Sequence, residues 1–468
     1  MPEIETMKEE LAETGNSRWE LTSGQLGIWY HQRLHPESSI YNVGEYLEIH
    51  GDLDIAVFEA ALRRVVSEVD TFHLRFYDDG ERVWQHVDKS SDWLLRVVDF
   101  SEEADPRVAA EDWMRTDMRH AFDLRDGPIF TEAILKVGPE TFFWYQIAHH
   151  IAWDASSAAL IAARVSRAYT KLLVGQPVAD DPLGPVSSLF ESHYSYRASA
   201  EFERDREFWL DMLAGFQGAA SVSGRQGQSA SQVARRHLEP VTAGDTADMK
   251  AAAWRFEVSF GVFMTVAGAI YLHRVTGAED IVLGFPVIWR IGERRRDTPG
   301  MTVNILPIRM TVHEATSIAS LAQQATTAIV SSLRHQRYHY VEISRDVRLV
   351  NNALFSMVIN IMPFDYRLSF GDCAARAHNL ANGPVDDLTV AVYDRTGGGI
   401  EISYDVNPVL YGAQAEKDIA RQLRNVMTWL TTASPGDWAG RAEIVDAAER
   451  AQVLTGWNDT AAAVPAGM

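Results

Sequence analysis

The sequence predicts an α/β protein made of two lobes, each a mixed sheet with helices packed on it. Residues 56–66 and 317–333 repeat apolar side chains with the period of a helix, whereas residues 46–50 and 142–148 are typical of strands. A stretch rich in glycine and proline, residues 175–185, separates two such mixed halves. The length of 468 residues also favours two or three folded units.

The first half alternates helices and strands, beginning with a helical pattern over residues 26–30. Residues 72–76 and 83–87 are strand-like, and the sequence Tyr77-Asp78-Asp79-Gly80 between them favours a turn, so we expect a hairpin. After the strand at 142–148, residues 158–173 form a helix that ends before the glycine- and proline-rich stretch.

The second half repeats this mixture. It begins with a long helical stretch, residues 190–213, and continues with a buried helix at 260–275 and a short core strand at 280–284. Two further strand-like runs, residues 388–393 and 400–404, form a second hairpin.

These patterns predict the boundaries of the parts. Residues 1–20 are polar and acidic and form an arm or linker. The N-terminal lobe spans 21–178, an inter-lobe linker spans 179–188, and the C-terminal lobe spans 189–455.

Composition limits the functions that we expect. The formal net charge of -21 repels phosphate backbones, so we do not expect nucleic acid as a partner. The single cysteine, Cys373, excludes an internal disulfide and a thiolate metal cluster and indicates a cytoplasmic setting. The start Met1-Pro2-Glu3-Ile4-Glu5 lacks the features of a signal peptide, and the apolar run at 260–272 is too short to span a membrane.

The most informative motif is His149-His150-Ile151-Ala152-Trp153-Asp154, directly after the strand at 142–148. An imidazole at a strand end can exchange a proton near neutral pH, and a carboxylate four residues later can pair with a cation. The chain has 15 histidines, however, so an adjacent pair is also compatible with ordinary packing. The motif alone leaves catalysis and packing open.

Other chemistries are poorly supported. A zinc site needs a third ligand and a spacing such as His-Glu-x-x-His, which is absent, so we expect no metal. No Gly-x-Ser-x-Gly sequence is present to expose a nucleophilic serine. The cluster Gly397-Gly398-Gly399 lies between two strand-like runs instead of opening a helix, which favours a hairpin turn over a phosphate loop.

The motif is one of an ordered set that spans nearly the whole chain. This set resembles the condensation domains of nonribosomal peptide synthetases. Its other members are Leu21-Thr22-Ser23-Gly24-Gln25 with Trp29, Phe72-His73-Leu74-Arg75, Gly284-Phe285-Pro286 with Arg290, and Asn304-Ile305-Leu306-Pro307.

Three further segments resemble siderophore synthetases in particular, enterobactin synthase component F among them. They are Arg334-His335-Gln336-Arg337-Tyr338, Phe364-Asp365-Tyr366 and Gly383-Pro384-Val385-Asp386-Asp387-Leu388. The tail, residues 456–468 with Trp457-Asn458-Asp459-Thr460-Ala461, resembles the start of a linker to an adenylation domain.

The resemblance implies two chloramphenicol-acetyltransferase-like lobes arranged in a V with a tunnel between them. It implies that donor and acceptor carrier proteins insert 4'-phosphopantetheine arms from opposite mouths, and that the donor acyl or peptidyl thioester is joined to the acceptor amine as an amide. The domain itself binds no cofactor, and its further partner is the adenylation domain of the same synthetase.

The resemblance also assigns roles to the site residues. His150 matches the residue beside the acceptor amine, and His149 lies behind it as a structural partner. Asp154 matches a carboxylate that pairs with an arginine, here Arg290. Ala155 replaces the family's usual glycine, whose N–H is unshielded, so a second hypothesis is a silent domain that docks a carrier protein or recruits a tailoring enzyme.

Overall fold

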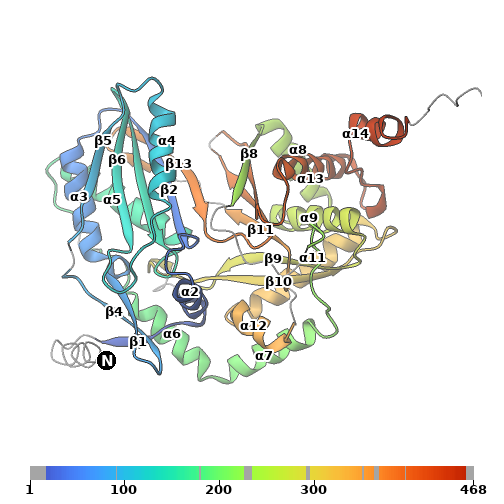
Figure 1. The fold of residues 1–468 in the computed structure, drawn as a ribbon, viewed down its shortest axis with the longest axis horizontal. Coiled ribbons are helices and arrows are strands. Elements are labelled where there is room, and N and C mark those ends of the chain that lie inside the picture. Colours follow the sequence, from blue (N-terminus) through green and yellow to red (C-terminus); the bar gives the residue numbers. More distant parts are fainter. Residues whose placement is uncertain are drawn as a thin grey trace, which may run out of the picture.

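The computed structural model describes residues 17–90, 92–178, 181–225, 234–290, 296–349, 353–362, 368–395 and 397–459. It has two lobes side by side, each built on a six-stranded mixed sheet (Figure 1). The predicted fold class is confirmed. Most predicted elements are present, because each depends mainly on the pattern of neighbouring residues.

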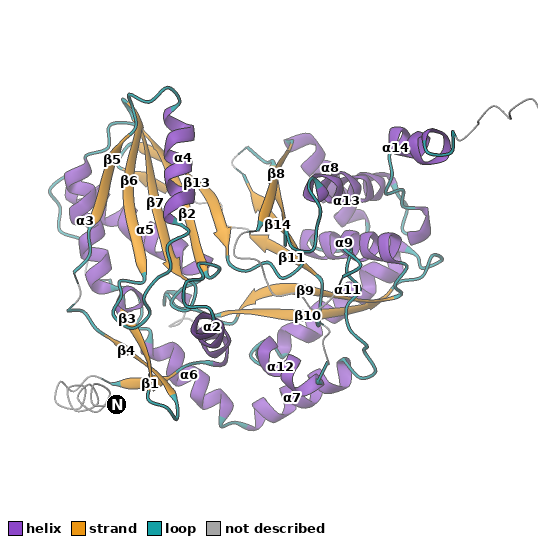
Figure 2. Cartoon of the chain, viewed as in Figure 1, coloured by secondary structure: helices purple, strands orange, loops and turns teal. Residues whose placement is uncertain are grey.

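The first lobe has the strand order β12-β13-β2-β7-β6-β5. Its central strands bury nearly every side chain, because helices cover both faces (Figure 2). Helices α3 and α5 pack on one face, where Phe58 and Trp144 meet, and α4 packs on the other through Met114. The bounds are β2 Asn42–His50, α3 Ile55–Glu68, β5 Leu95–Asp99, α4 Pro106–Asp117, β6 Phe130–Gly138, β7 Thr141–His149 and α5 Ala155–Leu173.

The second lobe has the strand order β10-β9-β11-β14-β15-β8. Helix α9 is buried on nearly all sides, which agrees with its uninterrupted apolar sequence. The strands are β8 Arg235–Val241, β9 Asp280–Ile288, β10 Val303–Thr311, β11 Met357–Met362, β14 Leu388–Asp394 and β15 Ile400–Val406. The helices are α8 Ala243–Arg255, α9 Phe260–Thr276, α11 Ile318–Arg334, α12 Tyr340–Val347 and α13 Ala415–Thr432.

A smaller unit joins the lobes. The predicted hairpin is present as β3 (Leu74–Asp78) and β4 (Val83–Val87), and β1 (Arg18–Glu20) pairs with β4. Together with α2 (Ser23–Leu34), this sheet shares a buried cluster with Trp289 of the second lobe. Residues 18–20, which were predicted to belong to the arm, are therefore part of a sheet.

The long helical stretch predicted at 190–213 is two helices, α6 (Ser187–Arg197) and α7 (Ala200–Met212). The chain leaves the helix at Ser199, whose backbone is extended. The two helices run along the bottom of the view from the first lobe to the second (Figure 1). Helix α5 begins at Ala155, three residues before the predicted start.

The predicted C-terminal lobe requires one correction. Strands β12 (Leu368–Phe370) and β13 (Cys373–Asn382) belong to the first-lobe sheet, where β13 pairs with β2. Phe370 and Cys373 are buried in the first-lobe core. The prediction that residues 189–455 form one lobe is therefore wrong for this segment, because strand pairing over more than 300 residues leaves no local pattern.

The chain ends are described in part. Helix α14 (Ala447–Ala451) is followed by a single π-helical turn, Gln452–Gly456. Residues 1–16, 179–180 and 460–468 of the predicted arm and linkers lie outside the described residues. Among the described residues no single helix is long and apolar enough to cross a membrane; α8 and α9 meet that criterion only as a pair bent by 91°.

Replacing Phe370 tests whether strands β12 and β13 stabilise the first lobe. Its ring is fully buried against Phe58 and Trp144, so Phe370→Ala should lower the free energy of unfolding by about 3–5 kcal/mol. Urea denaturation measures this loss. The neighbouring exposed substitution Ser369→Ala is the control, and an equal midpoint for the two variants would contradict the assignment.

Candidate active site

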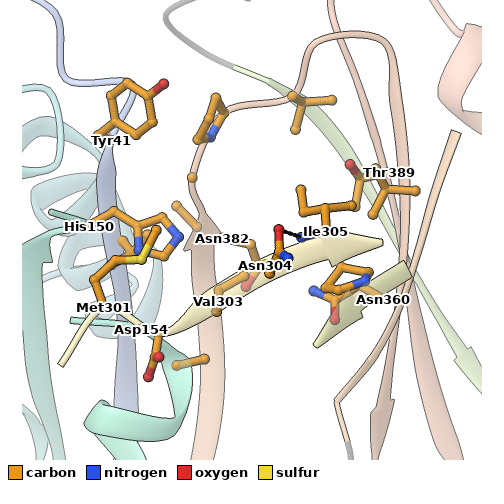
Figure 3. Close-up of a pocket in the computed structure, with 18 of the residues that line it drawn as sticks. Tyr41, His150, Asp154, Met301, Val303, Asn304, Ile305, Asn360, Asn382 and Thr389 are labelled. Atoms are coloured by element: carbon orange, nitrogen blue, oxygen red, sulfur yellow. Dashed lines mark hydrogen bonds between the residues drawn. The ribbon is translucent and has the colours of Figure 1, made fainter. Parts of the chain in front are cut away.

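A cavity of ≈ 470 Å³ lies between the lobes, and His150, Asp154 and Ala155 line it. Tyr41 and His150 face Asn304 and Asn360 of the second lobe across it (Figure 3). The wall combines the β7–α5 turn, strands β9 to β11 and the segment from β13 to β14. The cavity is thus made by parts of the chain that lie far apart in sequence.

His150 is held in one orientation by the backbone. Its Nδ1 lies 2.9 Å from the carbonyl oxygen of Trp153, and its own N–H donates to the carbonyl of Tyr41 at 2.8 Å. Burial lowers the pKa of His150, although the Trp153 carbonyl and the Asp154 charge oppose this. A neutral ring that donates through Nδ1 leaves the lone pair of Nε2 free to accept a hydrogen bond.

His149 faces away from this cavity into the protein. Its Nδ1 accepts the N–H of Ile151 at 3.3 Å, so Nε2 carries the proton and donates to Gln32 Oε1 at 3.2 Å. Burial lowers the pKa of His149 to about 3, with a smaller effect of His150. His149 is therefore a neutral residue that ties β7 to helix α2.

Asp154 and Arg290 form a buried ion pair between the lobes, with 2.8 Å between Oδ1 and Nη2. The other carboxylate oxygen, Oδ2, accepts the N–H and the hydroxyl of Thr302 at 3.0 and 2.7 Å. Arg290 also donates to the carbonyl of Gly300 and to Ser157 Oγ, at 2.8 and 2.7 Å. These hydrogen bonds offset most of the cost of burying the two charges, and only Nε of Arg290 has no partner among the described residues.

Asp154 is also the N-cap of α5. Its side chain accepts the N–H of Ser157 at 2.9 Å, and Ser157 Oγ lies 3.4 Å from the Asp154 N–H, which completes a capping box. Asp-x-x-Ser is a spacing by which the helix start could have been found in the sequence. The positive end of α5 consequently faces the cavity beside His150.

Ala155 is the first residue of α5 and its φ is not positive, so the backbone here does not require glycine. Its methyl group packs against Met362, Ala391 and Tyr393 of the second lobe. The alanine therefore causes no backbone strain at this position. The methyl group occupies space in the wall of the cavity.

Gly383 lies close to the ring of His150. Its φ is +93°, and a Cβ there would lie 3.0 Å from His150 Cδ2. Any other residue would be strained and would also press on the imidazole ring. The segment Gly383-Pro384-Val385-Asp386-Asp387-Leu388, identified by resemblance, therefore forms the wall opposite His150.

A row of polar side chains crosses the first-lobe sheet toward the cavity. Asn379, Glu45, Gln146 and Glu132 are aligned on four neighbouring strands. Gln146 Nε2 donates to Glu45 Oε1 at 2.9 Å. Burial raises the pKa of Glu132 to about 8, so its carboxyl group is neutral at pH 7. Of these four residues, Asn379, Glu45 and Gln146 line the cavity and make this part of its wall polar.

Several contributors were not found from the sequence, namely Gln32, Trp153, Ser157, Gly300 and Thr302. Trp153 and Gly300 act through backbone carbonyls, which any residue could supply, so no residue type signals them. Phe364-Asp365-Tyr366 and the loop residues Arg294 and Arg295 lie outside the described residues. No group of three or more His, Cys, Asp or Glu able to hold a metal occurs in the part of the chain that the structure describes.

Comparisons with known proteins agree with this geometry. The family model described as "Condensation domain" matches residues 16–454. The chain belongs to this family, the condensation domains. Among solved structures, a variant of the starter condensation domain of rhizomide synthetase RzmA with C8-CoA is 36% identical at a TM-score of 0.87, covering 94% of this chain and 99% of that one.

The relatives in sequence are nonribosomal peptide synthetases. The chain is 40% identical over 96% of its length to "Dimodular nonribosomal peptide synthase" of Bacillus subtilis, and 28% identical over 95% to "Enterobactin synthase component F" of Escherichia coli. The resemblance to the second protein is confirmed, although the first shares more residues. The chain spans 19% and 35% of the lengths of these relatives.

Removing one partner of the ion pair should destabilise the protein. Asp154→Ala leaves Arg290 buried without a carboxylate, so the free energy of unfolding should fall by about 3–5 kcal/mol. The double variant Asp154→Ala/Arg290→Ala should lose less than the sum of the single losses. Thermal and urea unfolding measure both, with Glu59→Ala in the exposed pair to Arg63 as control. An unchanged melting temperature for Asp154→Ala would contradict the role.

Acid should destabilise the fold through buried neutral histidines. Burial lowers the pKa of His149 and of His193 to about 3, and that of His339 to about 4. Below about pH 6.5 these histidines bind protons in the unfolded chain but stay neutral in the folded protein. Their contribution to the free energy of unfolding is therefore present above about pH 6.5 and is lost as the pH falls. His149→Gln should reduce the slope by about 1.4 kcal/mol per pH unit between pH 5 and 6. Equal slopes for the variant and the wild type would contradict this.

Proposed function

We propose that this chain forms an amide bond between a donor acyl or peptidyl thioester and the amine of an acceptor aminoacyl thioester. Both substrates are carried on 4'-phosphopantetheine arms of carrier proteins. The observation that carries the proposal is the orientation of His150, whose Nδ1 is engaged by the Trp153 carbonyl while the ring lines a cavity between two lobes. Family membership supports the same reaction class.

In the proposed reaction the amine nitrogen attacks the thioester carbonyl carbon. The new C–N bond forms as the C–S bond breaks, and the amine proton ends on the thiolate of the donor arm. An α-amino group has a pKa of about 7.7–8.0, so much of it is already neutral near pH 8. Accepting a hydrogen bond at Nε2 and orienting the amine is therefore sufficient for His150.

The N-terminus of α5 supplies the complementary electrostatics. Oxygen develops negative charge as the carbonyl carbon is attacked, and the positive end of the helix beside His150 favours this charge. The φ of Ala155 is not positive, so alanine fits the backbone at this position, which favours an active domain over the silent alternative. The Asp154–Arg290 pair holds this helix start at a fixed distance from the second lobe.

We also propose that the domain works within a siderophore-type synthetase, with an adenylation domain and carrier proteins in the same assembly. The support is the 28% identity to enterobactin synthase component F and the 25% identity to "Vanchrobactin synthetase VabF" of Vibrio anguillarum.

The test loads donor and acceptor carrier proteins with defined thioesters and measures the amide product by mass spectrometry. His150→Ala should lower turnover by about 10²–10⁴-fold, because the amine loses its hydrogen-bond acceptor. Ala155→Gly should keep turnover close to that of the wild type, and His35→Ala, at an exposed site outside the cavity, is the matched control.

Two results would contradict the proposal. Unchanged turnover in His150→Ala would remove its role. Product from Ala155→Gly but none from the wild type would establish that the methyl group of Ala155 silences the domain.

A further inference from the structure

Asp386 differs from the other carboxylates that line the cavity. The others have partners: Asp154 pairs with Arg290, Asp387 accepts from Tyr411, Asp405 pairs with Arg236, and Glu45 accepts from Gln146. The Asp386 side chain has no hydrogen bond or ion pair with another described residue. It is an uncompensated acidic group in the wall of the proposed substrate site.

The backbone fixes where this side chain lies. Asn407, which is fully buried, donates from Nδ2 to the carbonyl of Asp386 and from its N–H to the carbonyl of Asp387, both at 2.9 Å. Gly383, three residues earlier, lies against the ring of His150. Asp386 therefore lies on a loop that hydrogen bonds hold in place, three residues from the glycine beside His150. Its side chain makes no hydrogen bond or ion pair with another described residue.

The Asp386 side chain lines the cavity and is exposed to solvent there. Partial desolvation by the surrounding residues raises the pKa of Asp386 above its usual value. A partly desolvated carboxylate is stabilised by a cation that comes to lie beside it. The described residues of the wall supply no lysine or arginine for this, so a ligand can bring the cation.

Two phenol rings share this part of the cavity. Burial, and in second place the charge of Asp386, raises the pKa of Tyr41 to about 12. All three residues line the same cavity, and the pKa of Tyr340 is raised by burial, with smaller effects of Asp386 and Tyr41. Backbone bonds hold both tyrosines: the Tyr41 carbonyl accepts from His150, and the Tyr340 N–H donates to Asn304 Oδ1 at 2.9 Å.

The charge of the wall has one sign. No lysine or arginine occurs among the described residues that line the cavity. His339, which also lines it, is neutral at pH 7, because burial lowers its pKa to about 4. A carboxylate beside two aromatic rings, without a competing cation, is the composition that attracts ammonium and guanidinium groups.

We propose that Asp386, with the rings of Tyr41 and Tyr340, binds a cationic group, an ammonium or guanidinium, on the side chain of one of the two carrier-bound substrates. This inference rests on the proposed function, which brings those substrates into the cavity. A neutral apolar side chain at the same place would leave the carboxylate without a partner. An anionic side chain would be repelled.

Binding of unreactive analogues tests this without turnover. Two matched pairs of pantetheine amides distinguish the substrates: ornithyl against norvalyl for the acceptor, and an ω-aminoacyl against an alkanoyl chain of equal length for the donor. The α-ammonium is common to the first pair, so its contribution cancels. In one pair, the cationic member should bind the wild type about tenfold more tightly by calorimetry.

The variant Asp386→Asn keeps the shape of the side chain and should reduce that preference to about twofold or less. Asp92→Asn makes the same change in net charge at an exposed site and should retain it. His150→Ala should also retain the preference while losing amide formation. The binding measurement therefore distinguishes failure of this inference from failure of the proposed function.

Equal affinities within both pairs for the wild type would overturn the inference. A cationic preference that persists in Asp386→Asn would overturn it as well, because the preference would then come from another group.

Discussion

The buried ion pair between Asp154 and Arg290 is the constraint on which the site depends. Asp154 caps α5, and the carbonyl of the preceding residue, Trp153, orients the ring of His150. Arg290 anchors this turn to the β9–β10 connection of the other lobe, together with Thr302. The position of the imidazole is thereby linked to the packing of the lobes. The pair adds little net stability to a well-packed core, but loss of either partner leaves a buried charge, which enforces one arrangement.

Strand β13 also links the two lobes, through strand pairing instead of an ion pair. It belongs to the first-lobe sheet, yet the chain leads directly from it through Gly383 and Asp386 into β14 of the second lobe. Arg236 on β8 pairs with Asp405 and donates to the carbonyl of Leu380, which fastens the end of β13 to the second lobe. The segment that leads from β13 to β14 therefore forms the wall opposite His150.

The electrostatics of the cavity fit a reaction in which an amine must be neutral when it attacks. Burial keeps His149 and His339 uncharged, and it lowers the pKa of His150, so no imidazolium competes with the amine for a hydrogen-bond acceptor. The partial positive charge comes instead from backbone dipoles at the start of α5, which no proton can titrate. Asp386 differs because its carboxylate has no partner among the described residues, and it therefore indicates a charged group on a substrate.

The sequence alone determined the elements with strong periodicity, such as α9, α11 and the two hairpins, because their patterns depend on neighbouring residues. The order of its motifs also indicated the family and the partners Asp154 and Arg290. Only the tertiary structure decided the sheet to which β13 belongs, the carbonyl that orients His150, and the isolation of Asp386. Each of these depends on contacts between segments far apart in the chain, often through backbone atoms that every residue possesses, and such contacts leave no trace in residue type or spacing.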